Sequence, residues 1–83
     1  MIEEVHFNYT LAKQITNKEV DGFIQTTNEL NARIICFDFH NPAYPIIGLT
    51  CRNGGEEEIR RYDIDGKCEH DWTQFDLHLF IRK

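Results

Sequence analysis

The feature that most limits the fold of this chain is the set of turn signals in its second half. Asn41-Pro42, Asn53-Gly54-Gly55 and Asp65-Gly66 follow one another at intervals of roughly ten residues and separate short apolar segments. Segments of this length, divided by residues that accept positive φ, are typical of antiparallel strands. The sequence therefore predicts a mostly β protein with a short N-terminal helix, either a small five-stranded antiparallel SH3-like barrel or a rolled sheet.

Four strands are expected in this part of the chain, over residues 32–39, 46–51, 57–64 and 76–81. Each combines apolar or β-branched residues with a period of two, and Pro45 can open the second strand but cannot lie at its centre. The core is predicted to consist of Phe23, Ile35, Phe37, Ile47, Leu49, Ile59, Tyr62, Leu77 and Leu79.

A short helix is expected over residues 8–14, with Asn8 or Thr10 as its N-cap. A helix of this length is unstable alone, so it must pack on the rest of the protein. Its apolar side consists of Leu11, Ala12 and Ile15.

Residues 17–31 admit two interpretations. Apolar residues recur there at helical spacing, which indicates an α+β fold with one helix at 17–31 on a four-stranded antiparallel sheet. Against this, Gly22 costs about 1 kcal/mol in a helix interior, and two adjacent threonines favour a strand. The alternative is a strand over 22–27, a turn, and a second strand over 32–39. The residues alone leave both open.

A resemblance favours the strand. The chain resembles a family of small uncharacterised proteins from gut Bacteroides and their phages, whose strands carry the patterns RIICFD, YPI-x-L, Y-x-x-DG and DL. The resemblance covers residues 20–81, although the family's R-x-G turn is replaced here by Thr27–Asn31, which has no glycine. It implies the fold and no activity. The segments that carry it are Gly22–Thr26, Arg33–Asp38, Tyr44–Leu49, Tyr62–Lys67 and Asp76-Leu77.

The length and charge of the chain limit its partners. Its 83 residues make one small domain, 1–83. The formal net charge of −5 argues against nucleic acid, because neutralising phosphates requires a basic face. The longest apolar run, residues 34–37, is far too short to cross a membrane. We therefore expect neither a nucleic acid nor a membrane as partner.

Three cysteines at wide spacings indicate free thiols and a cytoplasmic location, since small secreted domains carry more cysteines in even numbers. No close C-x-x-C or H-x-x-x-H pair begins a zinc site. Because serine is absent, nucleophilic catalysis would need a cysteine–histidine pair, and Cys68 with His70 is the only candidate expected in an exposed loop. We expect no metal, no cofactor and no enzyme activity. The side chains that could ligate a metal are those of Cys36, His40, Cys51, Cys68, His70, Asp71 and His78.

The resulting prediction is a non-catalytic accessory module that binds another protein or a second copy of itself. Its docking site is expected on an exposed edge formed by the closing strand, through Leu77, Leu79 and Ile81. The alternative is an acidic phage-type inhibitor or nucleic-acid mimic that acts on a basic host protein. That alternative would use an acidic patch formed by Glu56, Glu57 and Glu58, and a compact acidic face that also included Glu69, Asp71 and Asp76 would favour it.

Overall fold

The computed structural model describes residues 1–52 and 54–83, so Asn53 of the expected turn lies outside the described residues. Six strands and a short helix confirm the mostly β prediction, with one strand more than expected; the SH3-like barrel is not confirmed. The elements are β1 (Ile2–Val5), α1 (Tyr9–Thr16), β2 (Gly22–Thr26), β3 (Asn31–Cys36), β4 (Ile46–Cys51), β5 (Glu57–Tyr62), the 3-10 turns η1 (Glu69–Asp71) and η2 (Thr73–Phe75), and β6 (Leu77–Arg82).

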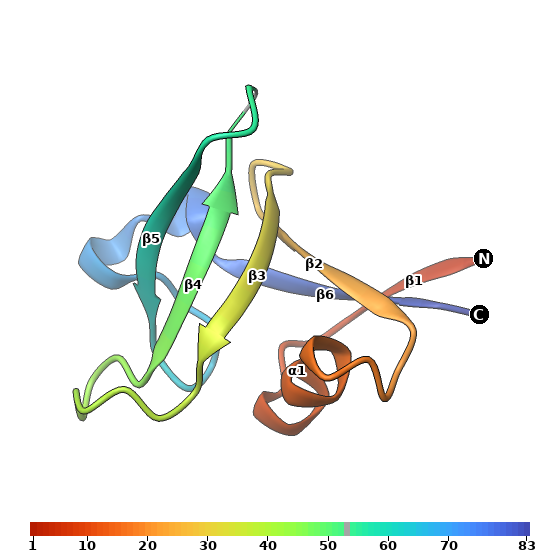
Figure 1. Cartoon of the computed structure of the whole chain (residues 1–83), viewed down its shortest axis with the longest axis horizontal. Helices are drawn as coiled ribbons and strands as arrows, with labels where there is room; N and C mark the ends of the chain where they lie inside the picture. Colours follow the sequence, from red (N-terminus) through yellow and green to blue (C-terminus); the bar gives the residue numbers. More distant parts are fainter. Residues whose placement is uncertain (53) are drawn as a thin grey trace.

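All strand pairs are antiparallel, and the strands form one open sheet in the order β1-β6-β2-β3-β4-β5. The last strand in the sequence, β6, lies inside the sheet between β1 and β2. The two termini therefore lie side by side (Figure 1). The N–H of Lys83 donates to the carbonyl of Met1 at 2.7 Å. The strands at the edges of the sheet are β1 and β5.

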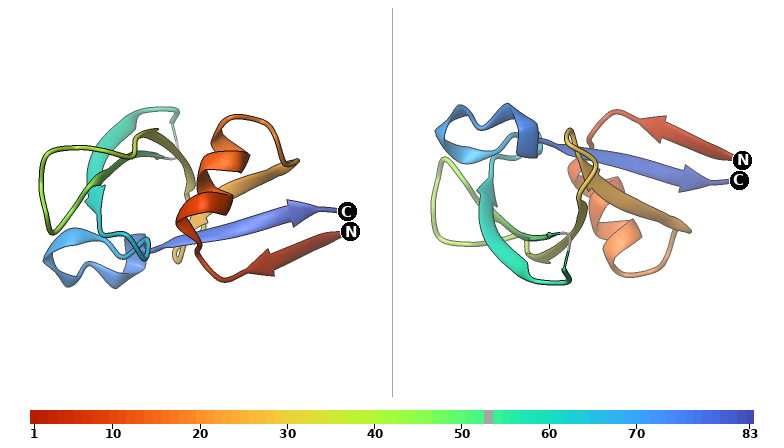
Figure 2. Two further views of the ribbon diagram at one scale, coloured as in Figure 1. Left: turned by 90° about the horizontal axis from the view of Figure 1, so that it is seen from below. Right: turned by 90° about the horizontal axis from the view of Figure 1, so that it is seen from above.

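The sheet is strongly twisted at its centre. β2 pairs with β3 only at Ile24–Ala32 and Gln25–Asn31, and beyond these residues the two strands diverge (Figure 1). β3, β4 and β5 consequently run across the direction of β2 and β6, and α1 lies where β2 and β3 separate (Figure 2). A register shift between Ile34 and Cys36 marks a β-bulge in β3, a feature that increases the local twist.

Helix α1 begins as the sequence predicts. The side chain of Asn8 accepts a hydrogen bond from the N–H of Leu11 at 3.0 Å, which satisfies one of the free donors of the first turn. Ala12 and Ile15 are buried, and Ile15 packs over Gly22 of β2. Glycine is required at position 22 because a Cβ there would lie 2.3 Å from the carbonyl oxygen of Phe80.

Residues 22–26 and 31–36 form an antiparallel pair, so the strand interpretation of residues 17–31 is confirmed and the single helix at 17–31 is wrong. The connecting turn has no glycine, and Glu29 adopts the left-handed conformation instead, with φ of 66°. The hydroxyl of Thr26 accepts from the N–H of Leu30 at 3.0 Å, and the N–H of Thr26 donates to the carbonyl of Leu30 at 2.9 Å. These two bonds close the turn.

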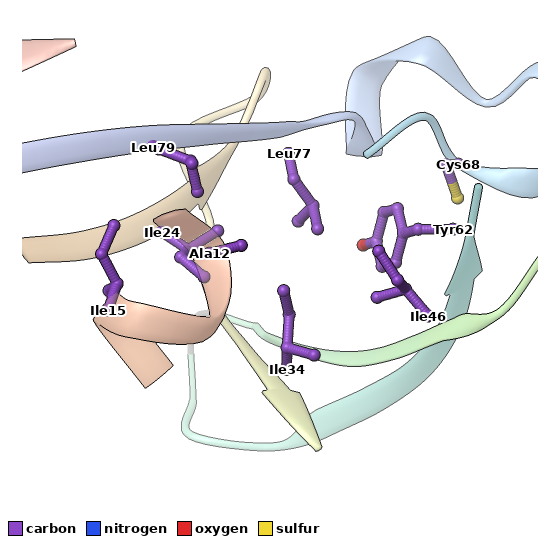
Figure 3. Close-up of a cluster of buried hydrophobic side chains, with 9 residues drawn as sticks. All are labelled: Ala12, Ile15, Ile24, Ile34, Ile46, Tyr62, Cys68, Leu77 and Leu79. Carbon is purple, nitrogen blue, oxygen red and sulfur yellow. The ribbon is translucent and has the colours of Figure 1, made fainter. Parts of the chain in front are cut away.

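The core lies between α1 and the concave face of the sheet (Figure 3). Leu79 and Ile24 pack with the helix, whereas Leu77 lies nearer to Tyr62 and the far strands (Figure 3). The buried hydrophobic residues are Ala12, Ile15, Ile24, Ile34, Ile46, Tyr62, Cys68, Leu77 and Leu79.

The predicted core is only partly correct. Tyr62, Leu77 and Leu79 are buried as expected, but Ile35 is 52% exposed and Ile59 is 70% exposed. The predicted core residues that are only half-buried are Phe23, Phe37, Ile47 and Leu49.

In β2, β3 and β4 the predicted core residues lie on the face opposite to the interior, whereas in β6 they lie on the inner face. In β4 the inner face carries Ile46, Gly48 and Thr50, and all three are buried. A Cβ at Gly48 would lie 3.0 Å from the ring of Tyr62, so this small residue leaves room for the large buried tyrosine.

Candidate functional site

The expected docking edge at the closing strand is wrong. β6 pairs with β1 along Ile2–Val5 and with β2 along Gly22–Thr26, so its backbone is occupied on both sides. Leu77 and Leu79 are 4% and 0% exposed, and Ile81 is half-buried. These three side chains belong to the protein's own interior rather than to a free edge.

The expected acidic patch is divided between the two faces of β5. The guanidinium of Arg33 donates to both carboxylate oxygens of Glu57 at 2.8 and 2.9 Å, and this hydrogen bonding lowers the pKa of Glu57. Glu58, on the other face, makes ion pairs with Arg52 at 3.1 Å and Arg60 at 3.4 Å. Glu56 is exposed and precedes the strand. Glu57 and Glu58 are thus largely neutralised by arginines.

The three cysteines are free. Within the described residues, no group of three or more histidine, cysteine, aspartate or glutamate side chains lies close enough together to bind a metal ion. Cys68 is 5% exposed, and burial raises the pKa of its thiol to about 11. His70 is exposed, and its ring lies against that of Trp72, with ring centroids 4.9 Å apart. At neutral pH Cys68 is therefore a protonated, buried thiol, unlike an activated nucleophile.

A chain of hydrogen bonds that the sequence did not predict links Glu4, His78 and Thr27. Nδ1 of His78 lies 2.8 Å from Oε2 of Glu4, and Nε2 lies 2.8 Å from the hydroxyl of Thr27. Because an ionised carboxylate only accepts, a neutral His78 donates from Nδ1 and accepts the Thr27 proton at Nε2. The order carboxylate, imidazole, hydroxyl is that of a catalytic triad.

The surroundings of these three hydrogen-bonded residues do not match those of a catalytic triad. An active site of that type needs free backbone donors to stabilise an oxyanion. The N–H groups of Thr27, Asn28 and Glu29 instead donate to backbone carbonyls at 3.0, 3.0 and 2.9 Å. Glu4 and His78 border an open hollow of ≈ 420 Å³, which Thr27 does not line. The three residues act as a clip that ties β1 and β6 to the turn between β2 and β3.

The separation of β2 from β3 creates a groove beside α1. Two adjoining hollows of ≈ 350 and ≈ 410 Å³ share Thr16 and Ile34 and together follow the side of β3 that faces the helix. We call this the α1–β3 groove. The hydroxyl of Thr16 is buried and has no hydrogen-bond partner among the described residues. The other lining residues include Tyr9, Lys13, Lys18, Phe23, Ile35 and Phe37.

The second exposed feature is the outer face of β4 and β5. Leu49 pairs with Ile59 and Ile47 pairs with Arg61, so these side chains share the convex side of the sheet. Ile59 is 70% exposed on the edge strand, and the guanidinium of Arg61 lies 5.4 Å from the ring of Phe39. On this face, therefore, an exposed apolar residue, Ile59, lies next to a charged residue, Arg61, on the edge strand.

No protein-family model, curated protein or solved structure matches this chain. The resemblance to the Bacteroides and phage proteins therefore stays a prediction.

Neither the clip nor the groove is predicted by the sequence. His78 and Glu4 are 74 residues apart, and only the pairing of β1 with β6 brings them together. The groove depends on where β2 and β3 stop pairing, for which we find no local signal.

Proposed function

We propose that this protein is a non-catalytic protein-binding module that holds an extended segment of its partner in the α1–β3 groove. The observation that carries the proposal is the unpaired side of β3. Asn31 and Ala32 pair with β2, whereas no pairing to β2 continues along residues 33–36. A strand paired on one side only leaves alternate N–H and C=O groups free to bind another strand.

The lining of the groove indicates what such a segment would contain. Ile35 is 52% exposed, and Phe23 and Phe37 are half-buried, so the groove offers apolar contacts for alternate side chains. Lys13 and Lys18 contribute positive charge. We infer that the bound segment is extended, with apolar residues that alternate with acidic ones.

The alternative function, an acidic inhibitor or nucleic-acid mimic, needs a compact acidic face. Glu57 and Glu58 lie on opposite faces of β5 and are paired with arginines, which favours the binding module instead.

We also propose a cytoplasmic location, which free thiols at Cys36, Cys51 and Cys68 would suit. None of the described helices has the length and apolar character needed to span a membrane.

The proposal is tested by selecting peptides from a random display library against the immobilised protein. We expect enrichment of extended sequences that alternate apolar and acidic residues. Binding should be lost in the variant Ile35→Lys, which places a charge in the groove. The matched control is Ile64→Lys, because Ile64 is similarly exposed, at 57%, and does not line the groove.

Amide hydrogen exchange provides the second measurement. Bound peptide should slow exchange at residues 33–36, where its backbone would pair. The proposal fails if no peptide is enriched, or if the selected peptides bind Ile35→Lys as well as they bind the unmodified protein.

A further inference from the structure

The edge strand β5 has a free side along most of its length. Its Tyr62 pairs with Ile46 on one side and forms an isolated bridge with Cys68 on the other. Among the described residues, no other strand pairs with the outer side of β5 at residues 57–61. Figure 1 shows β5 on the far side of the sheet from the two termini.

The charge pattern of this strand is complementary to itself. Two glutamates, Glu57 and Glu58, precede Ile59, and two arginines, Arg60 and Arg61, follow it. In a two-fold antiparallel pairing centred on Ile59, each glutamate faces an arginine of the second copy. The two isoleucines then face each other across the axis. Opposite charges and apolar residues placed directly opposite each other stabilise a pair of strands.

The isolated protein leaves part of this pattern unsatisfied. Ile59 is 70% exposed. Arg61 makes no ion pair within the described residues and instead lies beside the ring of Phe39. Glu57 is bound to Arg33, but a carboxylate has further acceptor sites for a second guanidinium. A second copy would therefore supply a carboxylate to Arg61 and cover Ile59.

We propose that this protein forms a two-fold symmetric dimer in which β5 pairs antiparallel with β5 of a second copy, centred on Ile59. The two sheets then join into one continuous sheet, and the interface is formed by the same edge of β5 in both subunits. The axis is perpendicular to the sheet, so the outer faces of the two copies, with Leu49 beside Ile59, lie on the same side.

Charged residues on an edge strand usually prevent pairing with other chains. Here they select one register instead. A shift by two residues in one direction places Glu58 opposite Glu58 of the second copy, and a shift in the other direction places Arg60 opposite Arg60. Like charges that face each other are unfavourable, so only the pairing centred on Ile59 is complementary throughout.

A contact limited to one strand and its neighbours is small, so association should be reversible and depend on protein concentration. The α1–β3 groove lies on the far side of β4 from β5 and remains free in the dimer. The dimer and the peptide binding proposed above are therefore separate, and each can fail without the other.

The test is sedimentation of the unmodified protein and of two charge variants over a wide range of concentration. Arg61→Glu places two carboxylates opposite each other, and Glu57→Arg places two guanidinium groups opposite each other. We expect the unmodified protein to dimerise and each variant alone to remain monomeric. An equal mixture of the two variants should form the dimer, because each reversed charge then faces its opposite.

The control is Arg82→Glu, which makes the same change of charge on β6, away from β5, and should dimerise like the unmodified protein. Circular dichroism checks that every variant is folded. The proposal is overturned if the unmodified protein remains monomeric at all concentrations. It is also overturned if Arg61→Glu alone dimerises as strongly as the unmodified protein, or if the mixture fails to recover association.

Discussion

Ile34 and Ile35 are adjacent in β3, yet Ile34 is 4% exposed and Ile35 is 52% exposed. Ile34 pairs with Gly48 and points into the core, where it lies beneath Leu77 (Figure 3). The register then shifts, so that Cys36 rather than Ile35 is opposite Ile47, and Ile35 is left at the α1–β3 groove. Two identical side chains therefore have different roles.

Replacing each isoleucine with alanine separates these roles. Ile34→Ala should lower the free energy of unfolding by about 2–4 kcal/mol, because it leaves a cavity in the core. Ile35→Ala should lower it by less than about 1 kcal/mol, since an exposed side chain loses little on truncation. Urea denaturation measures both values. A larger loss of unfolding free energy in Ile35→Ala than in Ile34→Ala would show that the inner face of β3 is assigned incorrectly.

The sequence supported the strands and the helix because their signals are local. Asn8 is a good N-cap, and the Asp65-Gly66 signal marks the turn at which Gly66 adopts a positive φ of 80°. Which face of a strand is buried depends on the opposing strands. Ile47 and Leu49 are larger than Gly48 and Thr50, yet the smaller residues face the core, and at Gly48 the ring of Tyr62 occupies the space that a side chain would need.

The error about the docking edge followed from a strand that was not recognised. β1 has only four residues, two of which are glutamates, and it has no apolar alternation to identify it. Without β1, the closing strand β6 has no neighbour on one side, so the sequence predicts an edge there. Pairing between the first and last residues of a chain depends on the whole fold and gives no local signal. The clip of Glu4, His78 and Thr27 was missed for the same reason.

A second prediction concerns the hydroxyl of Tyr62. This side chain is fully buried, and its hydroxyl has no hydrogen-bond partner among the described residues. An unpaired buried hydroxyl is unfavourable, so Tyr62→Phe should raise the free energy of unfolding by about 1–2 kcal/mol. The matched control is Tyr9→Phe, which removes a 3.2 Å hydrogen bond to the carbonyl of Phe37. Tyr9→Phe should therefore lower the stability of the protein. Thermal unfolding measures both variants, and equal effects of the two changes would contradict the conclusion that the Tyr62 hydroxyl is unpaired.

A third prediction concerns alkaline pH. Burial raises the pKa of the Cys68 thiol to about 11, whereas a thiol in an unfolded chain has a pKa of about 8.5. Between these values the unfolded chain releases a proton that the folded protein retains, so rising pH favours unfolding. This contribution to stability is complete below the lower pKa and is lost as pH rises toward the upper one. Burial also raises the pKa of Tyr62, which extends the loss to higher pH.

Melting temperatures measured across this range test the assignment to Cys68. Cys68→Ala should reduce the steepness of the alkaline loss, even though it lowers stability at neutral pH. The control is Cys51→Ala, which also removes one thiol, but from a half-buried position. If the two variants show the same dependence on pH, the loss does not originate at Cys68.

The last prediction distinguishes a structural clip from a catalytic site at Glu4, His78 and Thr27. Thr27→Val keeps the shape of the side chain but removes the hydroxyl that bonds His78 at 2.8 Å, whereas Thr27→Ser keeps the hydroxyl. As a clip, the site should lose about 0.5–1.5 kcal/mol of stability in the valine variant and less in the serine variant. Amide exchange in β1 should accelerate in the valine variant, because His78 also holds Glu4 of that strand.

A nucleophilic site would instead hydrolyse an activated ester, with activity lost in the valine variant and retained in the serine variant. We expect the same ester hydrolysis from all three proteins, and a loss confined to Thr27→Val would contradict the clip.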